Sequence, residues 1–159
     1  MKKLIICRGG QHGIGGELQV PAYDQMSRLA AAIRCHVPET NVTGEHISES
    51  VCIIASIYPH IAHSAILIAN ALRIDRVELL RSLALRDGKW TDEQLNAAVL
   101  EVCNQQVDNL IVVTHGALAK QILAICGRVM IDVTCKNMEF DFGHGEIIDR
   151  TVRAVTPIP

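Results

Sequence analysis

The chain has 159 residues, a length that suits one domain with its own hydrophobic core. Hydrophobic residues make up 49% of it and aromatic residues only 3%, so we expect a core of Ile, Leu, Val and Ala. The formal net charge of -2 argues against nucleic acid or an anionic membrane as the main partner. We therefore expect a single domain over residues 1–159, in which any basic function is confined to a local site.

The six cysteines include no Cys-x-x-Cys pair, and most of them lie in apolar runs such as LIIC. This pattern predicts free, buried thiols in a reducing compartment and argues against a structural zinc site. Two lysines near the N-terminus precede only four apolar residues, too few for a signal peptide, and no apolar stretch is long enough to span a bilayer. We expect a cytoplasmic protein that uses no cofactor.

The first half of the chain alternates between predicted strands and predicted helices. Residues 4–7 form an apolar run that predicts a buried strand, and a glycine-rich loop separates it from a helix over residues 22–33. A second apolar run over residues 51–56 predicts another strand, and helical spacing predicts a helix over residues 59–72. The segment RVELLRSL over residues 76–83 indicates a short strand.

The second half continues the alternation. Residues 91–94 contain a capping box that predicts the start of a helix. Residues 109–114 predict a further strong strand, and the helix over residues 116–125 is expected to stop at Gly127. Two alternating runs on either side of a glycine turn at residues 143–145 predict a C-terminal β-hairpin.

This order of elements predicts an α/β fold, specifically a three-layer α/β/α sandwich with a mostly parallel central sheet and a C-terminal β-hairpin. Ligands of such sheets bind beyond the carboxyl ends of the strands. Basic or imidazole side chains follow three of the predicted strands: Arg8 and His12, His60 and His63, and His115. Each of these places precedes a helix whose N-terminus favours an anion, so the sequence predicts an anion site there.

His115 is the most informative of these residues. A continuous apolar strand ends in Thr-His-Gly, which places an imidazole where ligands bind, and Gly116 allows the backbone to approach a ligand closely. We interpret His36, His46 and His144 as solvated side chains.

These segments resemble the motifs of the histidine phosphatase superfamily, the phosphoglycerate-mutase-like proteins, and especially its short phosphohistidine-phosphatase type. LIICRGGQ lies where the family has an apolar strand followed by Arg-His-Gly, and AYDQMSRLAAAI looks like the family's first helix. SIYPHIAHSAILIA resembles its Ser-x-Pro-x-x-Arg-Ala-x-x-Thr-Ala segment, NLIVVTHGALAKQIL its Val-Val-Ser/Thr-His-Gly segment, and NMEFDF suits its closing hairpin. The resemblance implies the same three-layer fold.

In that family, a histidine after the first arginine attacks phosphorus, while two arginines and a second histidine neutralise the phosphate oxygens. By this resemblance, Arg8 matches the first arginine and His115 the second histidine. Gly9 falls at the position of the nucleophile, and His60 falls at that of the second arginine, with one residue fewer before it. Glycine cannot carry a phosphoryl group, and a histidine is only partly charged at neutral pH, whereas an arginine is always charged.

The leading hypothesis is therefore a degenerate phosphatase, inactive or nearly so, with a binding or regulatory role. Its expected ligand is phosphate or a phosphorylated small molecule or protein. The phosphate-binding residues are expected to be Arg8, Gly9, His60, His115 and Gly116. Because unperturbed imidazoles titrate near pH 6.5, this hypothesis predicts that sulfate binds more tightly as the pH falls from about 8 to about 5.5.

Two alternatives remain open at this point. One is an active phosphohistidine or phosphoester phosphatase in which His12 or His115 is catalytic. The other is a metal site in which the carboxylate of Asp87 joins the imidazoles of His12, His60, His63 and His115, although these residues show no specific ligand spacing. Glu78 and Asp87 lie in the stretch where the family has its leaving-group acid.

Overall fold

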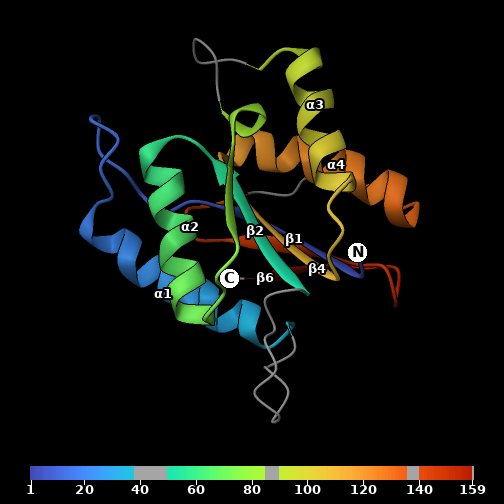
Figure 1. The fold of residues 1–159 in the computed structure, drawn as a ribbon, viewed down its shortest axis with the longest axis horizontal. Coiled ribbons are helices and arrows are strands. Elements are labelled where there is room, and N and C mark those ends of the chain that lie inside the picture. The colour runs from blue at the N-terminus through green and yellow to red at the C-terminus, as the bar shows by residue number, and fades with distance from the viewer. Residues whose placement is uncertain (38–49, 85–89, 136–139, 159) are drawn as a thin grey trace.

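The computed structural model describes residues 1–37, 50–84, 90–135 and 140–158. A six-stranded sheet with the order β3-β2-β4-β1-β5-β6 lies at its centre (Figure 1). The strands are β1 (Lys3–Arg8), β2 (Val51–Ser56), β3 (Val77–Leu80), β4 (Asn109–Thr114), β5 (Gly145–Asp149) and β6 (Ala154–Ile158). Strands β1 to β4 are parallel to one another. Strand β5 is antiparallel to its neighbour β1, and β6 is antiparallel to β5. The predicted α/β fold, with a mostly parallel sheet and a C-terminal hairpin, is confirmed.

Two pairs of helices cover the two faces of the sheet (Figure 1). One face carries α1 (Val20–Arg34) and α2 (Pro59–Leu72), and the other carries α3 (Asp92–Cys103) and α4 (Gly116–Ile131). Successive strand residues face opposite layers, so Ile5 belongs to the core under α1 and α2, while Leu4 belongs to the core under α3 and α4.

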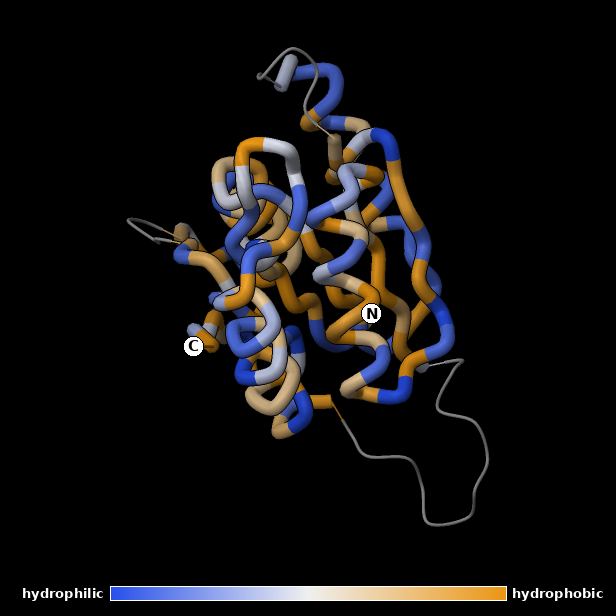
Figure 2. Tube along the Cα trace, turned by 90° about the vertical axis from the view of Figure 1, so that its left-hand side faces the viewer, coloured by the Kyte–Doolittle hydropathy of each residue, from blue (hydrophilic) through white to orange (hydrophobic). Residues whose placement is uncertain are grey.

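Burial on both faces explains why the central strands are continuous apolar runs in the sequence. Figure 2 shows hydrophobic segments running through the middle of the molecule, where these strands lie. Within the described ranges, no helix combines the length and the hydrophobicity that crossing a membrane requires.

Local sequence signals set several boundaries as predicted. Strands β2 and β4 and helix α2 have the predicted bounds. The capping box is present, because the hydroxyl of Thr91 accepts a hydrogen bond from the Gln94 N–H at 3.2 Å and the Gln94 side chain accepts one from the Thr91 N–H at 3.2 Å. The predicted strand over residues 76–83 is shorter, because β3 ends at Leu80 and a 3-10 helix (Arg81–Leu83) follows.

The prediction that Gly127 stops the last helix is wrong. Helix α4 continues to Ile131, and Asp132 ends it in the left-handed conformation with a φ of 58°. A Cβ atom on Gly127 would lie 2.7 Å from the sulfur of Cys135, so glycine serves here to let the following chain pack closely against the helix.

The predicted hairpin exists, but its turn lies at residues 150–153 and not at residues 143–145. Asp149 supports the turn, since its carboxylate accepts a hydrogen bond from the Thr151 N–H at 2.9 Å. Gly145 is already in β5, where a Cβ atom would lie 2.9 Å from the sulfur of Cys7. Gly143 adopts a left-handed φ of 76° in the turn before β5, and Gly145 allows close packing at the start of β5.

Gly10 provides a test of how the loop after β1 packs. A Cβ atom there would lie 2.7 Å from the Cβ of Ala22 on α1. We expect Gly10→Ala to lower the free energy of unfolding by about 1–3 kcal/mol through overpacking, measured by urea denaturation. Gly15→Ala is the matched control, because its Cβ would meet only the exposed, rotatable carboxylate of Glu17. Equal losses in the two variants would contradict this packing.

Candidate functional site

The carboxyl ends of β1 and β4 lie side by side at one edge of the sheet. Arg8 at the end of β1 is in register with Thr114 at the end of β4. The Cδ atom of Arg8 lies 3.0 Å from the point where Gly116 would carry a Cβ. The prediction that Arg8 and His115 meet at the same edge of the sheet is therefore confirmed.

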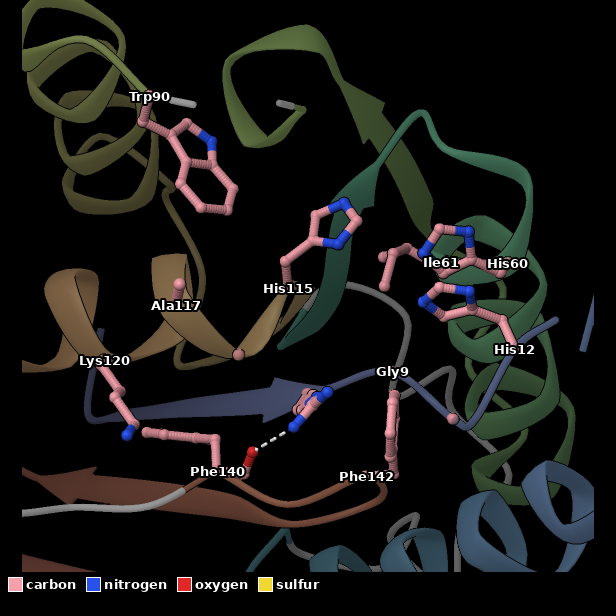
Figure 3. A pocket seen from close by; sticks show the side chains of 13 residues that line it. Gly9, His12, His60, Ile61, Trp90, His115, Ala117, Lys120, Phe140 and Phe142 are labelled. Carbon is pink, nitrogen blue, oxygen red and sulfur yellow. Dashed lines mark hydrogen bonds between the residues drawn. The ribbon is translucent and has the colours of Figure 1, made fainter. Parts of the chain in front are cut away.

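A cavity of about 440 Å³ lies over this edge (Figure 3). Its walls come from the loop after β1, the starts of α2 and α4, the residue before the capping box of α3, and the segment before β5. The residues that line it are Arg8, Gly9, Gly10, His12, His60, Ile61, Trp90, His115, Gly116, Ala117, Lys120, Phe140 and Phe142. All five residues predicted to bind phosphate are among them, as is His12. Of the described residues that line the cavity, none is acidic.

Arg8 is held in place by two contacts. Its guanidinium donates a hydrogen bond to the carbonyl oxygen of Phe140 at 2.8 Å, and its central carbon lies 3.6 Å from the centroid of the Phe142 ring. Burial lowers the pKa of Arg8, an effect that the nearby Asp141 partly offsets, and the side chain stays charged. The result is a fixed cation in the wall of the cavity.

Three imidazole rings form a row along the cavity (Figure 3). The ring centroids of His12 and His60 are 3.9 Å apart with an interplanar angle of 30°, and those of His60 and His115 are 5.2 Å apart. His12 belongs to the loop after β1, and its Nδ1 donates to the carbonyl oxygen of the next residue, Gly13, at 3.1 Å. The ring of Trp90 extends the row, with its centroid 5.9 Å from that of His115.

Burial keeps two of these imidazoles uncharged at pH 7. It lowers the pKa of His60 to about 4, and the neighbouring His12 adds to this shift. It also lowers the pKa of His115 to about 4, with further contributions from His60, His12 and Arg8. The expectation that these rings titrate near pH 6.5 therefore does not hold in the folded chain.

Three buried nitrogen atoms in the cavity wall have no hydrogen-bond partner among the described residues. They are Nε2 of His60, Nε2 of His115 and Nε1 of Trp90. An unsatisfied buried polar atom destabilises a folded protein, so such atoms are uncommon away from functional sites. Together they make this cavity the candidate site for a polar ligand.

Several other predicted residues lie elsewhere. His63 is exposed on α2, where its ring contacts Tyr23 at a centroid distance of 5.8 Å, and it does not line the cavity. Glu78 on β3 pairs with Arg76 at 2.7 Å, and Asp87 lies outside the described residues. Within the described ranges, no group of three His, Cys, Asp or Glu side chains is arranged to hold a metal ion. The metal-site hypothesis therefore gains no support.

Sequence reasoning missed several residues of the cavity wall, among them Trp90, Lys120 and Phe142. Lys120 follows Gly116 by one helical turn, so helical spacing could have identified it. The alternating pattern predicts Phe142 in a strand, whereas it lies in a turn before β5. Trp90 lies far from the other residues in sequence, and no local pattern links it to them.

Comparisons with known proteins place this fold. No protein family and no curated protein matches the sequence. Solved structures do match: the protein histidine phosphatase SixA complexed with tungstate has a TM-score of 0.65 and 13% identity, covering 98% of this chain and 93% of that one. A mycobacterial glucosyl-3-phosphoglycerate phosphatase matches at 0.61 and 11%, covering 99% and 97%. Phosphoglycerate mutase from Plasmodium falciparum matches at 0.58 and 11%, covering 98% and 87%. Over nearly its full length, the chain has the fold of the histidine phosphatases.

The lowered pKa values predict a pH-dependent stability. Between about pH 4 and pH 6.5 the unfolded chain binds protons at His60 and His115 that the folded chain does not bind, so the free energy of unfolding falls as the pH is lowered through this range. Above about pH 6.5 both rings are neutral in the folded and the unfolded chain, and this loss of stability is absent. We expect the free energy of unfolding to differ by about 1–2 kcal/mol per ring between the two ends of the range, a reduced value because water in the cavity screens the charge.

Denaturant titrations from pH 4 to pH 8 measure this dependence. His60→Gln and His115→Gln should each lose part of the wild-type slope, whereas His63→Gln, which alters an exposed imidazole outside the cavity, should keep all of it. A full wild-type slope in both cavity variants would contradict the assignment.

Proposed function

We propose that this chain is a degenerate histidine phosphatase that binds phosphate or a phosphorylated ligand with little or no turnover. In this proposal the protein has a binding or regulatory role. The observation that carries the proposal is the composition of the cavity wall. The fixed cation of Arg8, the cation of Lys120, imidazoles and unpartnered nitrogen atoms converge there, and the described lining contains no carboxylate.

Several groups in the cavity favour an anion. Arg8 supplies a fixed charge, and Lys120 supplies a second charge one turn into α4. Helix α4 starts directly at the cavity with Gly116 and Ala117, and no described side chain caps the amide groups of its first turn. Helix α2 also begins at this edge. Amide groups at helix N-termini stabilise bound oxyanions, and they act here together with the two cations.

The absence of turnover follows from two positions. We propose that Gly9 occupies the position of the family's nucleophilic histidine, because it follows Arg8 directly and lines the cavity. It has no side chain that could attack phosphorus. We also propose that His60 replaces the family's second arginine. Its imidazole is neutral at pH 7, so it cannot neutralise the charge of a transferred phosphoryl group as an arginine does.

One observation favours an active phosphatase as a second candidate. The loop after β1 returns His12 to the cavity, where its ring stacks on that of His60. With Nδ1 donating to Gly13, a neutral His12 would keep its Nε2 lone pair free for attack. A phosphoenzyme that is trapped in the wild type and lost in His12→Ala would establish this candidate.

Anion binding tests the leading proposal directly. We expect calorimetry to detect sulfate binding at pH 7, and we expect Arg8→Met to weaken it by about 10- to 100-fold, because a charge-assisted interaction is lost. The matched control is Arg28→Met, since Arg28 is 70% exposed and lies outside the cavity. That variant should bind as the wild type does.

The pH dependence of the same titration follows from the lowered pKa values. A bound anion favours the protonated imidazoles, so affinity should rise mainly as the pH falls below about 6. This window lies lower than the one that the sequence alone predicts. Sulfate binding that is absent, or unaffected by Arg8→Met, would overturn the proposal.

A further inference from the structure

The aromatic residues of this chain are concentrated at one place. The sequence has one Trp, two Tyr and two Phe, and the Trp and both Phe line the cavity, as Trp90, Phe140 and Phe142. The ring of Tyr58 contacts His115 of the cavity wall, with a centroid distance of 5.3 Å. The buried core elsewhere is almost entirely aliphatic. Phe140 and Trp90 also pack against the core under α3 and α4, so they combine a packing role with a place in the cavity wall, where an aromatic ring suits recognition of a flat organic group.

The size of the cavity also favours an organic ligand. Its volume of about 440 Å³ is several times that of a phosphate group. Sites for organic ligands occupy roughly 300–1,000 Å³ and combine apolar walls with a few placed polar atoms. A phosphate held at Arg8 and Lys120 would leave most of the cavity for the organic part of a ligand.

The free nitrogen atoms define what that organic part must offer. Nε1 of Trp90 is buried without a described partner, and an indole N–H can only donate. A ligand group that reaches this nitrogen would satisfy it by presenting an acceptor. Figure 3 shows Trp90 at the far end of the ring row from His12, with His115 between them. Nε2 of His115, also free, can donate or accept according to its tautomer.

We propose that the cavity binds a nucleoside monophosphate. This inference rests on the proposed anion site and names the class of its ligand. The phosphate lies at Arg8 and Lys120, two cations that match the double charge of a phosphomonoester. The base lies against Trp90 and His115, and one of its ring nitrogens or carbonyl oxygens accepts the indole N–H. A nucleobase provides both the flat face and the acceptor that this wall requires.

Tryptophan fluorescence reports on the cavity wall alone, because Trp90 is the single tryptophan of the chain. AMP, GMP, CMP, UMP, ribose 5-phosphate and inorganic phosphate are titrated at pH 7, with indole fluorescence and calorimetry as the two readouts. At least one nucleoside monophosphate should bind 10-fold or more tightly than ribose 5-phosphate and change the fluorescence of Trp90.

Two variants locate the base. Trp90→Phe keeps a flat ring and removes the N–H, so it should weaken the preferred nucleotide about 5- to 30-fold by calorimetry while changing phosphate affinity less than 2-fold. Tyr23→Phe, which alters an exposed aromatic residue outside the cavity, should change neither affinity.

The outcomes separate this inference from the proposed function. If phosphate binds but no nucleotide binds more tightly than ribose 5-phosphate, the nucleotide inference is overturned and the anion site stands. If a nucleotide is preferred but Trp90→Phe binds it equally well, the placement of the base at Trp90 is overturned. If none of the anions binds, the proposed function itself fails.

Discussion

The in-register pairing of β1 with β4 is the constraint on which the rest of this site depends. It places Arg8 opposite Thr114 and brings its side chain against the start of α4. The carbonyl oxygen of Phe140 and the ring of Phe142 then hold the guanidinium in the cavity wall. A shift of one residue in this pairing would send Arg8 to the other face of the sheet and separate it from the neighbouring strand end.

The cavity combines features that favour binding over phosphoryl transfer. Transfer needs a nucleophile and permanent charges around the developing transition state, and our proposal assigns glycine and a neutral imidazole to two of those positions. Binding needs only a fixed cation, free donors and space, and Arg8, the unpartnered nitrogens and the volume of the cavity supply these. Unsatisfied polar atoms destabilise the free protein, and a polar ligand would relieve that cost.

The sequence predicted what depends on local chemistry and neighbouring residues. The central strands and α2 followed from continuous apolar runs and helical spacing, and the convergence of Arg8 and His115 followed from the geometry of parallel sheets. Two of the predictions that failed, at Gly127 and at residues 143–145, concern glycines that make close contacts in the tertiary structure. A Cβ on Gly143 would lie 2.7 Å from the Cβ of Gln25 on α1, a contact that no local pattern reveals. The free indole N–H of Trp90 and the lowered pKa values of His60 and His115 likewise arise only from burial in the folded chain.

The central claim is that Gly9 stands where a nucleophile is missing, and restoring that nucleophile tests it most directly. A Cβ on Gly9 would lie 2.6 Å from Cδ1 of Ile61, so Gly9→His is combined with Ile61→Val, which removes that atom, and with His60→Arg, which supplies the second permanent charge. After incubation with a labelled acyl phosphate, acid-labile, base-stable label on histidine should be present in this triple variant and absent in the wild type and in the Ile61→Val, His60→Arg double variant. Label on the wild type, or a folded triple variant that takes up none, would contradict the claim.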